Sequence, residues 1–201
     1  MTLKAWLKAL RNSDNTMLQR YHSESCGFGF EGETFSEMHV SQLDLGGMDF
    51  VNTEWDACIL RGINFSGTDL RGSFFNGCTI HDCLFDETEL TDVSFDGCVL
   101  HRVVFKHLSF VDTELMDNQF KESIIENITF QDSTWLTTSL TGGKISTVRG
   151  SGQMRSVVMR DVSIYDFDTS DIEVENCRFF GEPTGIIPEG FIVRKGRRCR
   201  V

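Results

Sequence analysis

Large apolar residues recur at every fifth position along most of the chain. Counted in steps of five from Phe30 to Ile145, all 24 positions carry an apolar side chain. Because 40% of all residues are hydrophobic, a chance run of this length has a probability on the order of 10⁻¹⁰. A period of five fits neither an amphipathic helix nor a coiled coil. The pattern therefore predicts a solenoid built from five-residue repeats.

A second restricted position lies two residues before each large apolar residue. It holds mostly small side chains, as at Thr53, Cys58 and Ser73. Residues two apart on an extended chain point to the same side, so both positions are expected to face the interior. The alternation fails once per repeat, where glycine and polar residues such as Gly72 and Asp92 gather. We interpret each failure as a corner of the coil.

The period of five slips once, after Ile145. The chain passes through Gly150-Ser151-Gly152, and a second series of apolar positions runs from Met154 to Phe179. Nine residues separate Ile145 from Met154, one fewer than two repeats. We interpret the slip as a small distortion within one continuous solenoid.

This pattern resembles that of the pentapeptide-repeat family, in which Phe or Leu follows a small residue placed two positions earlier. The matching segments include Thr68-Asp69-Leu70-Arg71-Gly72, Ile63-Asn64-Phe65-Ser66-Gly67 and Cys98-Val99-Leu100. The resemblance covers roughly residues 28–180 and implies an all-β fold, a right-handed four-sided β-helix with four repeats in each 20-residue coil. Thirty repeats would then make about 7.5 coils and a rod ~36 Å long.

Both ends of a solenoid need covers, because each coil buries its core only against its neighbours. Helical spacing links four apolar residues near the start of the chain, Leu3, Trp6, Leu7 and Leu10. With Thr2 as a candidate N-cap, residues 2–12 are expected to form a short capping helix, and a membrane-surface helix is the weaker interpretation. We divide the chain into a capping helix and lead-in (1–27), the β-helix with a slip near 146–152 (28–180), and a C-terminal cap with a basic tail (181–201).

Acidic residues outnumber basic ones by 30 to 19, which gives a net charge of −11. The excess is concentrated in residues 21–145, which hold 21 acids and 6 bases. Such a charge disfavours direct binding to nucleic acid or to an anionic membrane surface. If a coil has 20 residues, positions twenty apart share a face, so the charges can be assigned to faces.

We number the four faces in chain order by their central apolar residues. Face 1 is built on Phe30, Phe50, Leu70, Leu90, Phe110 and Phe130. Face 2 is built on Phe35, Trp55, Phe75, Phe95, Leu115 and Trp135. Face 3 is built on Val40, Leu60, Ile80, Leu100, Phe120 and Leu140. Face 4 is built on Leu45, Phe65, Phe85, Phe105, Ile125 and Ile145.

Faces 1 and 2 together hold 13 acids and a single base, Arg71, whereas faces 3 and 4 carry both signs. One of the acids, Glu31, lies at the first coil. The other 12 are the candidate partner-binding residues Glu37, Asp49, Glu54, Asp56, Asp69, Glu89, Asp92, Asp96, Asp112, Glu114, Asp117 and Asp132.

The charge of the rod is of the order of that of DNA. B-DNA carries one negative charge per ~1.7 Å of axis, so ~29 Å of duplex holds ~17 charges, against −15 for residues 21–145. The quinolone-resistance group of the family consists of acidic rods that bind DNA gyrase in place of its DNA. This chain resembles that group in fold, length and charge, but without its projecting loops or its C-terminal dimerisation helix. The resemblance implies a non-catalytic rod that binds a protein, with a type II topoisomerase as the leading partner, whereas an acidic surface that only keeps the rod soluble is the alternative.

Face 4 offers a second candidate surface. Leu84, Val104 and Ile124 occupy outward positions in three successive coils and form an apolar stripe. Contiguous outward apolar residues mark surfaces for a partner or for self-association, although β-propensity alone also favours such residues in strands. The alternative function is therefore a protein-interaction scaffold, such as a bacterial effector or adaptor, or a homodimer formed through this stripe.

The sequence contains no phosphate loop, nucleophile–base pair or metal motif, so we expect neither an enzyme nor a cofactor. The seven cysteines include no CxxC pair, and five of them occupy inward positions: Cys58, Cys78, Cys83, Cys98 and Cys177. We expect free core thiols in a reducing cytosol, which places the protein in the cytoplasm. No apolar run of about 18 residues or secretory signal is found.

Two further features concern polar residues. Asn118 occupies an inward position, where it is expected to hydrogen-bond to a backbone group at a corner. His81 and His101 should stack on face 3 near Asp82 and Arg102. Ordinary exposed histidines are the favoured interpretation of this pair, and a surface zinc site is the alternative.

Overall fold

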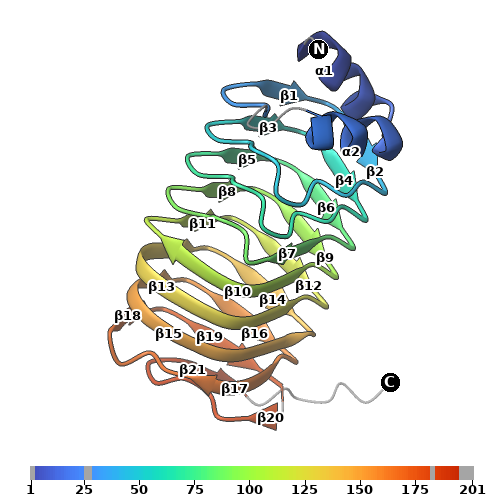
Figure 1. Cartoon of the computed structure of the whole chain (residues 1–201). Coiled ribbons are helices and arrows are strands. Elements are labelled where there is room, and N and C mark those ends of the chain that lie inside the picture. Colours follow the sequence, from blue (N-terminus) through green and yellow to red (C-terminus); the bar gives the residue numbers. More distant parts are fainter. Residues whose placement is uncertain (1–2, 25–28, 182–183, 195–201) are drawn as a thin grey trace, which may run out of the picture.

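The chain forms a rod of stacked coils with two helices at its N-terminal end (Figure 1). The structure is a computed structural model, and it describes residues 3–24, 29–181 and 184–194. All paired strands of the described residues are parallel, and before the slip partners in adjacent coils lie twenty residues apart, as in Trp55 opposite Phe75 and Phe75 opposite Phe95. The predicted all-β, four-sided β-helix is therefore confirmed, with about eight coils.

The strands form two sheets that run the length of the rod. The 12-stranded sheet contains β1 (Thr34–Ser36), β3 (Glu54–Asp56), β5 (Phe74–Asn76), β7 (Leu84–Asp86), β8 (Ser94–Asp96), β10 (Val104–Val111), β11 (Glu114–Met116), β13 (Ile124–Leu136), β15 (Lys144–Arg155), β17 (Ser163–Phe167), β18 (Ile172–Glu175) and β20 (Thr184–Gly185). The 9-stranded sheet contains β2 (His39–Ser41), β4 (Ile59–Arg61), β6 (Thr79–His81), β9 (Val99–His101), β12 (Gln119–Lys121), β14 (Ser139–Thr141), β16 (Val158–Arg160), β19 (Arg178–Phe180) and β21 (Ile192–Arg194). The 9-stranded sheet is face 3, and the long strands β10, β13 and β15 join the other faces into one sheet.

The corners are made by backbone in the left-handed region. From Gly32 to Thr147 every fifth residue has a φ between 50° and 72°. Gly, Asp and Asn tolerate this region best, and they occupy many of these positions. A β-branched residue such as Thr137 (φ 52°) is strained there. Each corner therefore ends one extended segment and turns the chain into the next.

The interior is filled by the two predicted apolar series. The central residues are buried, and many of their rings stack along the axis, as Phe75 does on Phe95 with centroids 4.7 Å apart. The small inward residues donate hydrogen bonds to the carbonyl oxygen of a central residue in the preceding coil. Thr68 donates to the carbonyl of Leu45 at 2.9 Å, and Ser73 donates to that of Phe50 at 2.7 Å. This ladder satisfies carbonyl groups that the corners bury.

Two helices, not one, cover the N-terminal end. Helix α1 (Leu3–Arg11) was expected, and it buries Leu10 in the core cluster. Helix α2 (Asn15–Glu24) was not expected, since its only buried apolar residue is Leu18 among its described side chains. Asp14 caps it, because its carboxylate accepts the Met17 amide at 3.0 Å. The candidate N-cap Thr2 lies outside the described residues, and no described helix is long and apolar enough to cross a bilayer.

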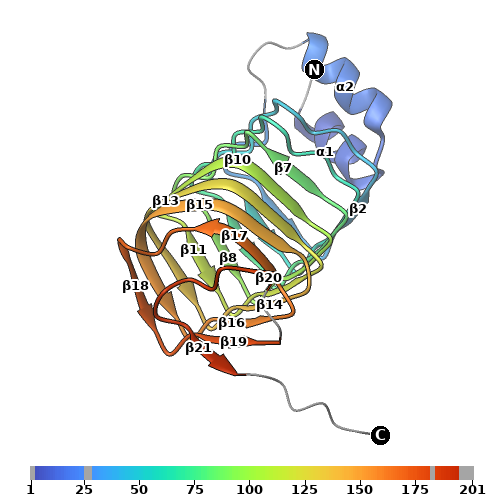
Figure 2. The same ribbon diagram turned by 90° about the horizontal axis from the view of Figure 1, so that it is seen from below.

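The loop between the helices and the start of α2 pair with the open edge of the first coil. The Ser41 amide donates to Ser13 Oγ, and the Asp44 amide donates to Asn15 Oδ1, both at 2.9 Å. Gln19 Nε2 donates to the carbonyl of Asp44 at 2.6 Å. These bonds occupy backbone groups that would otherwise be available to another strand. Figure 2, which shows the rod turned by 90°, places both helices beside the first coils.

The slip of the period lies between β13 and β15. Phe130 pairs with Gly150 and Ser133 pairs with Gly152, so β15 has one residue fewer than β13 across this interval. The φ angles of Gly150 and Gly152 are 130° and 142°, and a Cβ on either glycine would clash with the carbonyl oxygen of Phe130 or Ser133. Glycine is therefore required for the two coils to remain in contact across the slip.

The described C-terminal segment continues the coil. Strand β20 pairs with β17, and β21 pairs with β19, with Phe179 opposite Val193. Phe191 is buried, whereas Ile186 is 80% exposed. The first residue of the expected basic tail, Arg194, ends β21. The rest of this tail, from Lys195 onward, lies outside the described residues.

Asn118 provides a test of the interior hydrogen-bond ladder. As expected, it bonds to backbone: Nδ2 donates to the Phe95 carbonyl and Oδ1 accepts the Cys98 amide, both at 2.8 Å. Replacing Asn118 with Ala leaves both buried groups unsatisfied, so we expect a loss of about 1–3 kcal/mol of unfolding free energy. Urea denaturation followed by circular dichroism measures it.

Asn118→Thr is the matched control. Thr113 and Thr138 occupy equivalent positions and donate their hydroxyls to the carbonyls of Leu90 and Leu115. The Thr variant should therefore lose less than half as much stability as the Ala variant. Equal losses for the two variants would contradict a role for the side-chain bond.

Candidate partner-binding surface

All 12 candidate acidic residues lie at the surface of faces 1 and 2. Eight of them are exposed: Glu37, Glu54, Glu89, Asp92, Asp112, Glu114, Asp117 and Asp132. The other four are half-buried: Asp49, Asp56, Asp69 and Asp96. The coil register thus brings onto two adjacent faces residues that are spread over nearly 100 positions of sequence.

Several of these carboxylates lie directly above one another. On face 1, Asp49 pairs with Asp69 and Asp69 pairs with Glu89 through isolated β-bridges in successive coils. Like charges on neighbouring strands repel and destabilise a sheet. This column therefore adds negative potential at some expense of stability.

A second column of acids lies at a corner of the coil, where the backbone conformation partly explains the choice of residue. Asp92, Asp112 and Asp132 occupy the corner between faces 1 and 2, with φ angles of 58°, 52° and 51°. Aspartate tolerates this conformation better than most residues. Asparagine or glycine would serve the corner equally well without charge, so the backbone accounts for a small polar residue and not for three carboxylates.

Only one of the 12 carboxylates forms an ion pair among the described residues. Arg71 Nη2 lies 2.6 Å from Asp69 Oδ2, and its Nε donates to Asp69 Oδ1 at 2.9 Å. This hydrogen-bonded guanidinium lowers the pKa of Asp69 below its usual value. Other members accept neutral donors, as Asp56 does from Asn76 Nδ2 at 2.7 Å. The negative charges of the other 11 carboxylates are therefore not compensated by a base among the described residues.

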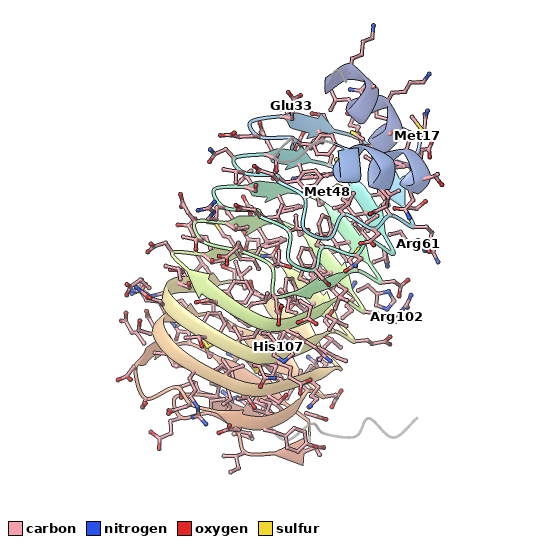
Figure 3. All side chains as sticks on the ribbon, in the orientation of Figure 1. Met17, Glu33, Met48, Arg61, Arg102 and His107 are labelled. Carbon is pink, nitrogen blue, oxygen red and sulfur yellow. The ribbon has the colours of Figure 1, made fainter. Side chains whose placement is uncertain are left out.

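Four of the six acids of faces 3 and 4 are instead paired with bases, namely Asp82, Asp86, Glu122 and Glu126. Arg102 Nε lies 2.6 Å from Asp82 Oδ1, and its hydrogen bond lowers the pKa of that carboxyl group. Lys106 and Lys144 both approach Glu126, at 3.9 and 3.6 Å. In Figure 3, Arg61 and Arg102 lie along one edge of the rod.

Acids in the coils after the slip also form ion pairs. Arg149 lies 2.7 Å from Asp166, and Arg155 lies 3.3 Å from Glu173. The uncompensated acids are thus concentrated on faces 1 and 2, in the coils before the slip.

Phe74 belongs to this surface and was missed by the sequence analysis. It lies on face 2 with 37% of its surface exposed, between Glu54 and Ser94 in the coils on either side. The Phe74-Phe75 pair was the available signal, because only one of two adjacent residues on a strand can point inward. An exposed aromatic ring among carboxylates offers an apolar contact to a cationic partner.

The apolar stripe of face 4 is in register but is not prominent. Val104 of β10 pairs with Leu84 of β7 and with Ile124 of β13. All three side chains are half-buried, and Lys144 follows Ile124 in the next coil. The stripe is therefore a short apolar strip that ends at a cation.

The two histidines of face 3 lie next to each other in successive coils, as expected. Their rings meet edge to face with centroids 5.2 Å apart, and His101 also approaches Glu122 at 3.3 Å. Burial and the neighbouring His101 lower the pKa of His81 below its usual value. Among the described residues, no group of three or more His, Cys, Asp or Glu side chains is arranged to hold a metal ion.

The comparisons with known proteins concern fold and family. A family model describing eight copies of the pentapeptide repeat matches residues 41–77 and 49–86. Among solved structures, a trypsin-treated variant of QnrB1, a plasmid-mediated fluoroquinolone resistance protein, is 13% identical, with a TM-score of 0.53 over 82% of this chain and 84% of that chain. HetL of Nostoc sp. strain PCC 7120, a pentapeptide repeat protein involved in regulating heterocyst differentiation, is 12% identical, with a TM-score of 0.35 over 88% and 91%. The comparison with curated proteins finds no match.

The five inward cysteines are buried free thiols, as expected, and Cys26 and Cys199 lie outside the described residues. Burial raises the pKa of Cys83 to about 12. Because the thiol ionises at lower pH in the unfolded chain, near 9, it stabilises the fold below pH 9 and this contribution is lost as the pH rises toward 12.

We therefore expect the unfolding free energy of the natural chain to fall more steeply from pH 8 to pH 10 than that of Cys83→Val. The difference should be about 1 kcal/mol. Urea denaturation at both pH values measures it, and valine suits the site because Val93 and Val103 occupy equivalent buried positions. Parallel pH profiles for the two proteins would contradict the elevated pKa.

Proposed function

We propose that this chain acts as a pentapeptide-repeat protein, without catalysis, by binding another protein through the acidic surface of faces 1 and 2. The partner is a protein whose own binding site is cationic. We propose that this partner is a DNA-binding enzyme in which the rod takes the place of duplex DNA. The leading candidate is a type II topoisomerase such as gyrase. The rod would then modulate the enzyme or protect it from quinolones.

The single observation that carries the proposal is the distribution of ion pairs. Eleven of the 12 carboxylates on faces 1 and 2 have no ion-pair partner among the described residues, whereas four of the six acids on faces 3 and 4 have one. A rod that needed charge only for solubility would gain nothing from leaving one side uncompensated and stacking its acids in columns. An uncompensated side accelerates association with a cationic site and orients the rod on it.

The geometry of the acidic surface suits a partner protein whose binding site is a long groove. Successive coils place carboxylates at multiples of ~4.8 Å along the axis, on two faces that meet at the corner of Asp92, Asp112 and Asp132. Phe74 adds an apolar contact within the charged surface. The likeness to QnrB1 supports the fold and makes gyrase the first enzyme to test. We place the activity in the cytoplasm, which the free buried thiols support.

Charge reversal on face 2 tests this proposal. Replacing Glu54, Asp56, Glu114 and Asp117 with Lys should weaken binding to gyrase by at least about tenfold at low salt, because attraction becomes repulsion. Surface plasmon resonance with immobilised gyrase measures affinity, and a supercoiling assay with and without a quinolone measures the effect on the enzyme. Binding of the natural chain should also weaken as salt rises.

The matched control reverses four exposed acids that lie outside the acidic surface: Glu87, Asp161, Asp171 and Glu189. It changes the net charge equally and should leave the affinity within about twofold of the natural chain. Arg71→Gln, which removes the one base of faces 1 and 2, should strengthen binding. The proposal fails if the natural chain does not bind gyrase at micromolar concentration, or if both four-residue variants lose affinity equally.

The apolar stripe supports an alternative, a scaffold or adaptor that binds a protein partner or a second copy of itself through face 4. In this case Leu84→Ser, Val104→Ser and Ile124→Ser together should abolish partner capture, while face 2 reversal should not. These positions are half-buried, so circular dichroism must first establish that the triple variant remains folded. Retained binding by the folded variant, or an unchanged mass in light scattering where a dimer is tested, would exclude this surface.

A further inference from the structure

A hollow of about 550 Å³ lies on face 4, next to the apolar stripe. It spans β13, β15 and β17, and its lining is Glu126, Lys144, Ser146, Thr147, Ser163 and Tyr165. It is a shallow depression that is open to solvent over most of its surface, so a ligand would lie across it. It lies away from the acidic surface of faces 1 and 2.

The hollow exists because a short side chain lies between two long ones. Ser146 pairs with Glu126 in the coil before it and with Tyr165 in the coil after it. The three residues therefore form one column, with the serine at its centre. Since neighbouring coils are ~4.8 Å apart, the two long side chains begin ~10 Å from each other.

Ser146 is exceptional in its burial. Ile145 points into the core, so the next residue on the strand points outward. Yet Ser146 is only 6% exposed, and its Oγ has no hydrogen-bond partner among the described residues. A buried hydroxyl group without a partner is rare in folded proteins. Here it is an unused donor in the lining of the hollow, which a ligand reaches once the neighbouring side chains move aside.

Lys144 supplies a cation in the lining of the hollow. Lys144 lies 3.6 Å from Glu126, and Lys106 lies 3.9 Å from the other oxygen of the same carboxylate. Two ammonium groups thus share the Glu126 carboxylate, while Asp86, which pairs with Lys106 in the preceding coil, is hydrogen-bonded to His107. Ser163, which pairs with Lys144, adds a second hydroxyl group.

The opposite wall of the hollow is aromatic. The Tyr165 side chain belongs to a residue that is 44% exposed, so its ring is available to a ligand. Exposed tyrosine rings contribute apolar contact area at a low entropic cost. An anionic group near Lys144 and a ring against Tyr165 would occupy the two sides of the hollow at once.

We propose that this hollow binds a small aromatic carboxylate. Its carboxylate accepts hydrogen bonds from Ser146 Oγ and Lys144 Nζ, and its ring packs on Tyr165. The interaction is binding alone, with no bond made or broken. The same chemistry is carried by a free metabolite and by a peptide that ends in phenylalanine, so both sources are included in the test.

The probe is 4-fluorobenzoate, titrated into the full chain and followed by ¹⁹F NMR and by backbone amide shifts. We expect saturable binding with a Kd of about 1 mM or below and shifts centred on residues 144–147 and 163–165. Benzamide, which has the same shape without the charge, should bind at least about tenfold more weakly. The peptide Gly-Gly-Phe with a free carboxylate, compared with its C-terminal amide, separates the peptide source from the metabolite.

Two variants assign the site. Ser146→Ala and Lys144→Gln should each weaken 4-fluorobenzoate binding by at least about fivefold. Ser146→Ala should leave the melting temperature unchanged or higher, because it removes a buried hydroxyl group with no partner. Ser94→Ala on face 2 and Lys121→Gln on face 3 are the matched controls and should bind as the natural chain does.

The outcomes separate clearly. Saturable binding that depends on Ser146 and Lys144 supports the proposal, and tighter binding of the peptide carboxylate would identify a peptide C-terminus as the source. The proposal is overturned by an absence of saturable shifts up to about 10 mM at low salt. It is also overturned by equal affinity for benzamide, or by affinities unaffected in the two site variants.

Discussion

A left-handed residue at every fifth position is the constraint on which this structure depends. Each such residue turns the chain from one face of the coil to the next, and the run from Gly32 to Thr147 has no break. Four equal segments then close a coil of 20 residues, and every side chain lies over its equivalent in the neighbouring coils. The aromatic stacks, the inward hydrogen-bond ladder and the surface columns all follow from this register. A polar corner residue such as Asp112 therefore serves both the backbone and the surface.

The interior converts that register into stability. The central residues of each face bury large apolar side chains. The small inward residues bury hydroxyl or thiol groups that donate to a carbonyl of the preceding coil, as Thr68 does to Leu45. Asn118 uses both ends of its amide in the same way, which explains how a polar residue belongs to the core. Because the interior is the same on all four sides, it leaves the outward positions free to differ. The four faces consequently share one backbone and carry different chemistry.

The sequence was sufficient for the parts of the structure that depend on period. The coil, the core and the faces on which acids lie follow from counting in fives and twenties. Features that depend on particular side-chain contacts did not follow. Helix α2 escaped notice because Leu18 is its one buried apolar residue among the described side chains, and its cap comes from Asp14 in a loop. The pairing of Glu126 with two lysines requires knowledge of side-chain positions.

Ser146 shows the limit of such counting most clearly. Its position is outward by period, yet its neighbours in the column, Glu126 and Tyr165, are long enough to bury it. Exposure in this fold is therefore a property of a column and not of a residue. Phe74 is the opposite case, since it lies beside the smaller Ser94 and keeps 37% of its surface exposed.

The 20-residue coil also determines how such a rod can change in length. Duplication of one whole coil would lengthen it by ~4.8 Å and leave every column aligned, whereas any other insertion would rotate all later residues around the axis. The one-residue slip at Gly150–Gly152 is a small example, absorbed where two glycines permit close backbone contact. Growth by whole coils would let the acidic surface be matched to binding grooves of different lengths without any change in its composition.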